Sequence, residues 1–372
     1  MTLTRRSLIL STLALAACNA SAQVRPVQRG ADPGLVPQRT ANWLAWVDGY
    51  KGRAAARGID AGVTERAFAD AGYLSGVVER DRNQTEFKRS FEDYLQLVAS
   101  EERVRLGRAA FQRQRSRLAA IETRYGVPAQ IVAAIWGVES RFGERRGDIS
   151  VISSTSTLAY DGRRGAFFEK QLDAALRILQ SGDTTPDRLV GSWAGAMGHT
   201  QFIPTSYQAF AVDFTGDGRR DIWADDPSDA LASTAAYLSR SGWRLGGLAA
   251  REEAGGNLTP DRGGPSFRTG RNFGVIKRYN NSDSYALAVS YLADRIAGGG
   301  PLQGSFGPDR NGMTQAQRRA LQERLNAAGF DAGTPDGVIG GGSKRAIEAY
   351  QRANGLAVTG EPSLRLLSAL GG

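Results

Sequence analysis

Apolar residues recur at helical spacing over most of the chain. Within residues 42–143, Trp43 and Trp46 begin one apolar stripe, and the same spacing continues along that segment. Residues 186–250 alternate helical patterns with glycine-rich turns, and a further helical pattern covers residues 283–296. We therefore predict a mainly α-helical protein of the α+β class.

Irregular segments divide this helical pattern into parts. Residues 23–40 are polar and aperiodic and are typical of a tether. Residues 251–274 are predicted to form a long irregular loop, and a small β segment is expected around residues 243–278. Residues 299–313 have the glycine-rich composition of a linker, and the segment 314–372 has its own apolar pattern. We therefore expect one large helical domain before the linker and a small domain of three short helices after it.

The first 22 residues have the pattern of a secretory signal. Two arginines precede an apolar stretch over residues 8–17, which is too short to span a bilayer. Two cleavage sites are compatible with this sequence. Leu-Ala-Ala-Cys at residues 15–18 resembles a bacterial lipobox and would leave Cys18 as the lipidated first residue, whereas Ala-Ser-Ala at residues 20–22 would release a soluble protein. We favour the lipobox because the only cysteine falls at the position that it requires.

The residue counts exclude several kinds of chemistry. With one cysteine and one histidine, the chain cannot form an internal disulfide framework or a structural zinc site of Cys and His ligands. A serine or cysteine nucleophile would have to use His199, the only histidine. Catalysis must therefore rely on carboxylates, Tyr, Lys or a hard metal ion. The net charge of +9 suits a polyanionic partner, but the chain has no long basic run with interleaved aromatic residues, so we expect no nucleic-acid partner.

Glu139 is the carboxylate that the apolar pattern singles out. Pro128 opens a predicted helix over residues 129–142. The apolar face of this helix consists of Ile131, Ile135, Val138 and Phe142. Glu139 lies on the same face, where desolvation would raise its pKa and keep it protonated at neutral pH, as a general acid requires. The alternative is a buried structural ion pair with Arg141 or Arg145.

Three sequence blocks resemble one enzyme family. GVPAQIVAAIWGVESRFG over residues 126–143 is similar to the catalytic-helix motif of the lytic murein transglycosylases, in particular the membrane-bound lytic transglycosylase B family. GSWAGAMGHTQFIPTSY over residues 191–207 and RYNNSDSYALAV over residues 278–289 resemble two further signatures, in the order of that family. The resemblance implies a lysozyme-like catalytic domain over residues 41–298.

The resemblance also implies a reaction, the cleavage of the β-1,4 bond between N-acetylmuramic acid and N-acetylglucosamine of peptidoglycan without hydrolysis. Glu139 would protonate the glycosidic oxygen and then act as base on the muramic acid 6-hydroxyl, which closes a 1,6-anhydro ring. A muramidase-type hydrolase is one alternative, and it needs a second carboxylate, for which Glu144, Asp148 and Asp161 are candidates. A non-catalytic peptidoglycan-binding lipoprotein is the other.

The same blocks imply further residues of the substrate site. By their positions in the family signatures, these are Ser192, Met197, Gln201, Tyr279, Asn280 and Tyr285. Core packing or turn chemistry is the alternative for each of them, and for Met197 it is the stronger interpretation. Arg163-Arg164 match a paired arginine of the family, while Phe167 stands where some members have Tyr. His199 falls at a variable position of its block and is interpreted as incidental.

Residues 213–229 begin like an EF-hand loop. The oxygen ligands expected from the spacing are Asp213, Thr215, Asp217, Arg219 through its carbonyl, and Asp221. Ala224 stands at position 12 of the loop, where a bidentate Glu is usual. In the resembling family a later Asp supplies the last ligand of a comparable loop, and Asp229 or Asp226 would serve here. The sequence thus predicts a structural Ca²⁺ site or, as the alternative, a metal-free Asp-rich turn. No cofactor is expected for catalysis.

The segment 314–372 resembles the common peptidoglycan-binding domain. The residue pairs that match include Leu321-Gln322, Gly329-Phe330, Asp336-Gly337 and Thr359-Gly360. The resemblance implies a module that raises the local concentration of peptidoglycan strands around the catalytic domain.

Taken together, these features predict a monomeric periplasmic lipoprotein that binds peptidoglycan glycan strands. Cys18 would anchor it to a membrane, and Asn19 in place of an Asp at the next position favours the outer membrane over the inner one. Cleavage after Ala22 would instead give a soluble periplasmic protein.

Overall fold

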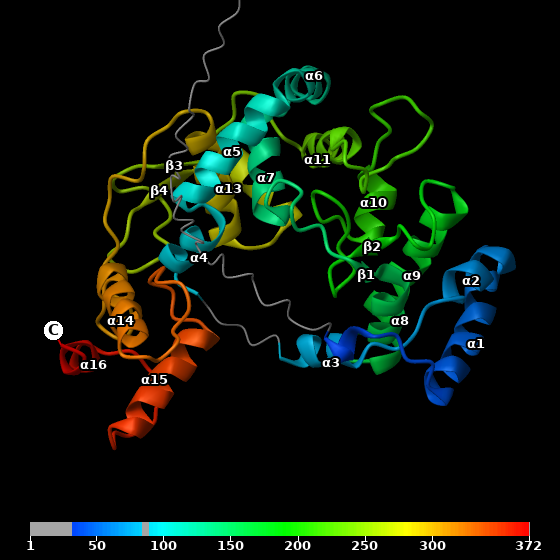
Figure 1. The fold of residues 1–372 in the computed structure, drawn as a ribbon. Helices are drawn as coiled ribbons and strands as arrows, with labels where there is room; N and C mark the ends of the chain where they lie inside the picture. Colours follow the sequence, from blue (N-terminus) through cyan, green and yellow to red (C-terminus); the bar gives the residue numbers. More distant parts are fainter. Residues whose placement is uncertain (1–31, 84–88, 372) are drawn as a thin grey trace, which may run out of the picture.

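The computed structural model describes residues 32–83 and 89–371. The signal predicted at residues 1–22, with Cys18, lies outside the described residues. The described part is mainly helical with two short antiparallel strand pairs, which confirms the predicted fold class (Figure 1). None of the helices in this part is long and apolar enough to cross a membrane.

The N-terminal elements form one end of the large domain. They are the 3-10 turn η1 (Pro33–Leu35) and the helices α1 (Ala41–Ala56), α2 (Ala61–Phe68) and α3 (Ser75–Arg82). α1 packs on α8 (Val151–Asp161), and α2 packs on both α8 and α9 (Gly165–Gln180) (Figure 1). Trp43, Tyr50 and Phe68 are buried in these contacts, so the apolar stripe that begins at Trp43 becomes part of a core.

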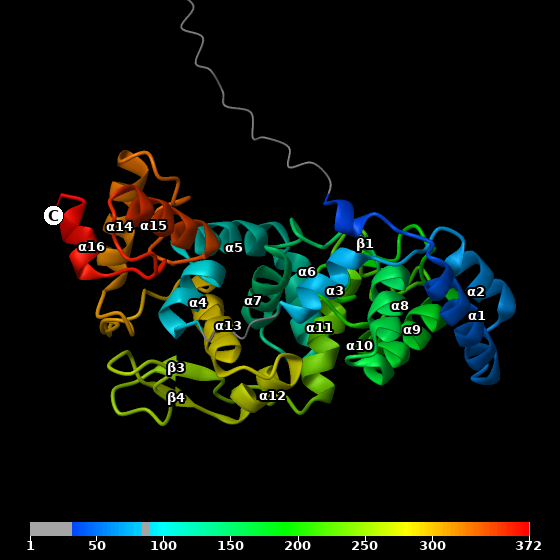
Figure 2. The same cartoon turned by 90° about the horizontal axis from the view of Figure 1, so that it is seen from below.

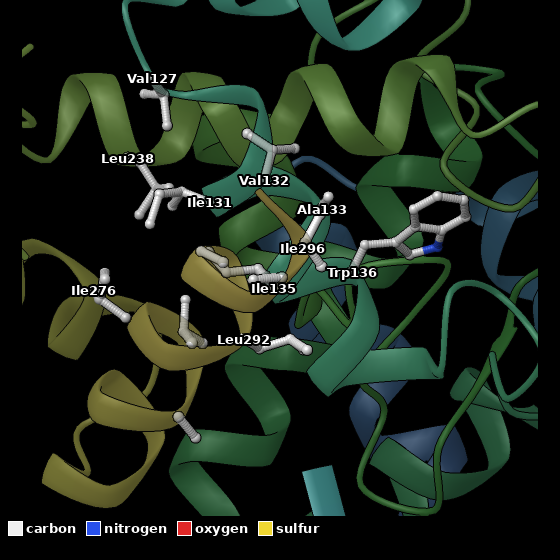
Figure 3. Packing of buried hydrophobic residues seen from close by; sticks show 14 of the residues in the cluster. Val127, Ile131, Val132, Ala133, Ile135, Trp136, Leu238, Ile276, Leu292 and Ile296 are labelled. Carbon is white, nitrogen blue, oxygen red and sulfur yellow. The ribbon is translucent and has the colours of Figure 1, made fainter. Parts of the chain in front are cut away.

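A second core surrounds α7 (Ala129–Ser140), the helix that carries Glu139. The helices packed on it are α5 (Glu101–Arg113), α6 (Arg115–Tyr125), α11 (Ser228–Arg240) and α13 (Asp283–Ile296). Figure 3 shows Ile131 and Ile135 of α7 beside Leu292 of α13 in this apolar cluster. Because the whole run 131–137 is buried, neighbouring helices fix the position of α7 on all sides.

Two short strand pairs complete the large domain. β1 (Ile149–Ser150) pairs with β2 (Val190–Gly191), and β3 (Ala250–Glu252) pairs with β4 (Phe267–Thr269). The remaining helices of this domain are α4 (Phe91–Val98), α10 (Pro204–Phe210) and α12 (Arg271–Tyr279). The small β segment is therefore present, but the prediction of an irregular loop over residues 251–274 is wrong in part. β4 and the start of α12 lie inside that range, and strands of three residues are too short to show an alternating apolar pattern.

Three helices form the small C-terminal domain, as predicted. They are α14 (Gln315–Ala327), α15 (Gly341–Ala353) and α16 (Leu364–Ala369), and the domain lies beside α4 in both views (Figures 1 and 2). Thr314 and Gln317 form a capping box that satisfies the first N–H groups of α14. Leu321, Leu325 and Ile347 belong to a core that this domain buries by itself.

A buried arginine joins the small domain to the large one. Arg318 of α14 is only 1% exposed. Its guanidinium donates to Glu92 and Asp93 of α4 at 2.9 and 2.8 Å, and to Asp309 of the linker at 3.1 Å. Burial raises the pKa of Glu92 and of Asp93, and Arg318 opposes this rise. Arg318 therefore partly offsets the cost of burying these two carboxyl groups.

The linker between the domains follows a defined path. Glu252 of β3 accepts hydrogen bonds from the backbone N–H groups of Gln303 and Gly304 at 2.7 and 2.6 Å. The ring of Phe306 lies 6.2 Å from that of Phe91 at the start of α4. The glycine-rich composition of this linker is thus combined with specific contacts to the large domain.

We predict that Arg318→Ala loosens the small domain from the large one. Without the guanidinium, the carboxylates of Glu92, Asp93 and Asp309 repel one another in a partly buried place, a loss on the order of 3 kcal/mol. Small-angle X-ray scattering should show a larger radius of gyration, and calorimetry a separate transition at lower temperature. Arg319→Ala removes the exposed neighbouring arginine and should change neither. If Arg318→Ala behaved like this control, apolar contacts alone would hold the domains together.

Candidate active site

Glu139 lies in the last turn of α7, where its side chain is partly buried. Burial raises the pKa of this carboxyl group from its ordinary value of 4.5 to about 7. The hydroxyl of Tyr285 on α13 donates a hydrogen bond to Glu139 Oε1 at 2.7 Å and opposes this rise, because it favours the charged form. At neutral pH the carboxyl group therefore exists in both forms, which suits a group that gives and takes a proton.

Within residues 32–83 and 89–371, no arginine pairs with Glu139. Arg141, one of the two expected partners, pairs instead with Glu102 and with Glu144. The other expected partner, Arg145, is exposed. Among the described residues Glu139 takes part in no ion pair, so the alternative of a structural salt bridge is wrong.

The three candidates for a second carboxylate are engaged elsewhere or exposed. Glu144 is 2.8 Å from Arg141, and Asp161 is 2.6 Å from Arg82. Asp148 is exposed ahead of β1. Within the described part of the chain, none of the three hydrogen-bonds to Glu139 or to its hydroxyl partner.

The chain leaves α7 through a strained turn. φ is 54° at Arg141 and 59° at Phe142, in the left-handed region that residues with side chains rarely adopt. The turn folds the ring of Phe142 back onto Gly137, where a Cβ would lie 2.5 Å from a ring carbon. The helix therefore ends at Ser140, before the predicted end at residue 142. This packed turn holds the segment that carries Glu139 in one position.

The second sequence block forms tight turns beside this helix. Backbone bridges link Met197 to both Gly191 and Phe202. Met197 is fully buried, which agrees with the core-packing interpretation of this residue. Ser192 keeps partial exposure, and its hydroxyl accepts a hydrogen bond from the N–H of Ala196 at 3.1 Å.

Gln201 is held through its amide nitrogen. Its φ is 54°, and Nε2 donates to the carbonyls of Arg146 and Gly198 at 3.0 and 2.9 Å. Gly198 is required there, because its φ is 70° and a Cβ would lie 2.4 Å from the carbonyl oxygen of Ile222. No donor from the described residues reaches the Gln201 side-chain oxygen, which is therefore available to a ligand hydroxyl.

The third block connects the other two. Tyr285, which is 1% exposed, supplies the hydrogen bond to the carboxyl group on α7. The hydroxyl of Tyr279 donates to the carbonyl of Thr200 in the second block at 2.6 Å. Asn280 is exposed at the C-terminal end of α12. The three blocks that the sequence singled out thus meet around Glu139.

Two residues near the site were missed by the sequence analysis. The pKa of Tyr94 on α4 is raised, first by burial and then by the charge of Glu139, so the two groups interact electrostatically. No signature block includes α4, and the sequence offers no signal for this contact. His199, which the sequence analysis interpreted as incidental, is 4% exposed, and both of its ring nitrogens have partners. Its position inside a signature block was the available signal.

The paired arginines contact a buried carboxylate. Arg163 and Arg164 lie 2.6 and 3.3 Å from Asp81 of α3, which is 1% exposed. Phe167 is exposed, and the Arg164 guanidinium lies 5.5 Å from the centre of its ring. These residues connect α3 with the start of α9.

The EF-hand-like segment is held by hydrogen bonds to its own backbone. The ligands predicted from the sequence include Asp213, Thr215, Asp217, Arg219 and, as the last one, Asp229. Asp213 accepts from the N–H groups of Gly216 and Gly218 at 2.6 and 2.8 Å. Asp229 accepts from three backbone N–H groups of the same segment. In residues 32–83 and 89–371, no three His, Cys, Asp or Glu side chains form a group that could hold a metal ion. As arranged, these residues do not fit a ready-made Ca²⁺ site.

Comparisons with known proteins agree with the geometry. Residues 42–255 and 249–294 match the Transglycosylase SLT domain family, and residues 314–370 match the peptidoglycan binding domain family. The chain is 34% identical to membrane-bound lytic murein transglycosylase B of Escherichia coli, over 46% of this chain and 58% of the relative. It therefore spans little more than half the length of that relative.

Solved structures show similarity over more of the chain. SltB3 from Pseudomonas aeruginosa, in complex with NAG-anhNAM-pentapeptide, is 41% identical with a TM-score of 0.69, and the match covers 90% of this chain and 100% of SltB3. The Escherichia coli lytic transglycosylase Slt35 in complex with calcium is 26% identical with a TM-score of 0.58, and the match covers 72% of this chain and 97% of Slt35.

We predict that Glu139→Gln stabilises the fold above neutral pH. Folding raises the pKa of Glu139 from 4.5 to about 7, so between these values the folded protein keeps a proton that the unfolded chain has lost. The free energy of unfolding therefore falls as pH rises through this window, by on the order of 3 kcal/mol for this group.

Gln carries no charge in either state, so the variant should exceed the wild type by about that amount at pH 8 and match it at pH 4. Urea unfolding at the two pH values measures the difference. Equal stabilities at pH 8 would mean that Glu139 titrates as an ordinary exposed carboxyl group.

Proposed function

The chain belongs to the Transglycosylase SLT domain family, and from this premise we propose that it is a lytic murein transglycosylase. Its substrate is the β-1,4 bond between N-acetylmuramic acid and N-acetylglucosamine in peptidoglycan, and its product ends in 1,6-anhydromuramic acid. The observation that carries this proposal is Glu139, a partly buried carboxyl group with a pKa of about 7 and no cationic partner among the residues that the structure describes. The SltB3 complex with NAG-anhNAM-pentapeptide supports the product class.

One carboxyl group performs both proton transfers. Glu139 first gives its proton to the glycosidic oxygen, the bond from that oxygen to the muramic acid C1 breaks, and N-acetylglucosamine leaves with a 4-hydroxyl. The resulting carboxylate then takes the proton of the muramic acid 6-hydroxyl, whose oxygen bonds to C1. Glu139 ends protonated, and no water is consumed. The hydrogen bond from Tyr285 stabilises the carboxylate between the two steps.

The remaining signature residues are assigned to the glycan. The side-chain oxygen of Gln201 accepts a hydrogen bond from a sugar hydroxyl, while its nitrogen stays bound to the backbone. Tyr279 and Asn280 border the site at the end of α12, and an aromatic ring offers a sugar both an apolar face and a polar tip. Ser192 contributes a partly exposed hydroxyl, and Met197 shapes the turn from within the core.

A muramidase-type hydrolase is the alternative on the same fold. It would require a second carboxylate that activates or replaces water. Glu144 and Asp161 are bound in ion pairs and Asp148 is exposed, which favours the single-carboxylate reaction. A non-catalytic binding lipoprotein would have no reason to keep the pKa of one carboxyl group near 7.

Two further statements rest on the sequence. We place the enzyme in the periplasm as a monomer, anchored to the outer membrane through Cys18, and the membrane-bound relative from Escherichia coli supports a membrane location. A structural Ca²⁺ at residues 213–229 stays a prediction, supported by the calcium complex of Slt35. A cation there would have to replace the backbone N–H groups that now donate hydrogen bonds to Asp213 and Asp229.

We predict that the mature protein converts purified sacculi into products ending in 1,6-anhydromuramic acid. Mass spectrometry distinguishes them from hydrolysis products, which are one water heavier. Glu139→Gln should lower turnover by a factor of about 10³. Glu144→Gln, the same change at an exposed neighbour, should leave turnover near the wild-type level. Products heavier by one water would show a hydrolase, and bound sacculi without products would show a binding protein.

Deleting residues 311–372 is predicted to weaken binding to sacculi and to spare cleavage of soluble glycan strands. Because the deletion removes Arg318, it is combined with Glu92→Gln and Asp93→Asn, which leave no uncompensated carboxylate on α4. Arg318→Ala in the full chain keeps the domain and should keep sacculus binding in a sedimentation assay. Unchanged binding after the deletion would show that the small domain has a structural role and does not bind the sacculi.

A further inference from the structure

The only histidine of the chain is buried between α7 and residues 222–224 of the EF-hand-like segment. The indole Nε1 of Trp136 donates to Nδ1 of His199 at 3.1 Å, and Nε2 of the ring lies 2.7 Å from the carbonyl oxygen of Ala224. An indole N–H can only donate and a carbonyl can only accept. The ring must therefore be neutral, with its proton on Nε2. Figure 3 shows the Trp136 indole turned away from the apolar cluster around Ile135.

The main chain at His199 is tied to α7 as well. The hydroxyl of Ser140, the last residue of α7, donates to the carbonyl of His199 at 2.5 Å. The N–H of His199 donates to the carbonyl of Ile222 at 3.2 Å. Two residues further on lies Gln201. His199 thus joins three segments, namely α7, the second sequence block and the bend at residues 222–224.

The charged groups that face the ring act in opposite directions. Burial lowers the pKa of His199, the hydrogen bond to Ala224 opposes this, and repulsion from Arg146 adds to the lowering. An Nη of Arg146 lies 3.4 Å from Nε2, and the same guanidinium pairs with Asp225 at 2.9 Å. Asp225 and Asp226 favour the charged ring from a longer range. α7 presents only an uncharged indole to the ring.

We propose that His199 is a positioning residue for Glu139 and Gln201, and that protonation of its ring switches the enzyme off in acid. The second proton would go to Nδ1, where it would face the N–H of Trp136. Two donors cannot share one hydrogen bond, so Trp136 would lose its acceptor, and of the two hydrogen bonds that tie α7 to His199 only that of Ser140 would remain. The inference rests on the proposed function, because it concerns the geometry of the same site.

In the single-carboxylate reaction, the effect of His199 protonation on activity can be separated from the titration of Glu139. Glu139 must carry its proton at the start, so activity falls above pH 7 or so, in line with its pKa of about 7. Lower pH does not remove the base, because the first step of the reaction creates it. Glu139 therefore causes no loss of activity in acid, and such a loss below the ordinary histidine pKa of 6.5 reports on His199.

Nuclear magnetic resonance tests the ionisation directly in the full-length mature protein without a histidine tag. Since the chain has one histidine, the ring gives one set of signals. We expect the Nε2–H tautomer at pH 7 and a titration midpoint below 6.5 that coincides with the acid limb of kcat/KM on soluble glycan strands. An Nδ1–H tautomer, a midpoint at or above 6.5, or an acid limb at a different pH would overturn the proposal.

Two variants test the consequence for activity. His199→Asn keeps an acceptor near the position of Nδ1 and cannot be charged, so the acid limb should disappear while activity at pH 7 falls by no more than about tenfold. His199→Phe has no acceptor and should be about tenfold or more below the wild type at pH 7, with a gap that narrows as the wild type loses activity in acid. An unchanged acid limb in His199→Asn would overturn the proposal.

The outcomes separate this inference from the proposed function. Turnover retained in Glu139→Gln, or hydrolysis products, would contradict the proposed function, whereas the titration of His199 requires no turnover. If His199→Asn failed to fold, the comparison of midpoints in the wild type would still decide the matter.

Discussion

The rest of the site depends on one constraint, which is that the partly buried carboxyl group of Glu139 pairs with no cation in the described part of the chain. Burial raises the pKa of Glu139 to about 7, and among the described residues its carboxyl group is bonded to the Tyr285 hydroxyl and to no cation. An arginine in the same place would hold the carboxyl group permanently charged and remove its use as an acid. The arginine nearest in sequence, Arg141, stands in the left-handed turn that ends α7 and pairs with Glu102 and Glu144.

The surrounding structure keeps this unfavourable arrangement in place. α7 is buried along most of its length, and the strained turn after it is packed against Gly137. Tyr285 reaches the carboxyl group from α13, and His199 joins the last turn of α7 to the block that holds Gln201. Each of these contacts restricts the chain or buries a polar group, and this by itself lowers the free energy of unfolding. The large apolar core around α7 offsets this loss of stability.

The sequence reveals the central parts of this arrangement because they leave local patterns. The apolar face of α7 has helical spacing, so Glu139 could be placed on it, and the signature blocks pointed to Gln201, Tyr279 and Tyr285. Contacts between distant segments leave no such pattern. Tyr94 approaches Glu139 from α4, and Arg318 crosses from the small domain to Glu92 and Asp93. The EF-hand spacing was visible, but whether its oxygens face a cation or backbone N–H groups depends on the path of the loop.

The protonation of Glu139 near neutral pH can be measured without turnover. Protein labelled with ¹³C at the glutamate side-chain carboxyl carbons gives one signal that is missing in Glu139→Gln, and this signal can be followed against pH. We expect its midpoint at about pH 7. A midpoint near the ordinary value of 4.5 would mean that the carboxyl group is charged at neutral pH, and Glu139 could not then donate the proton that begins the proposed reaction.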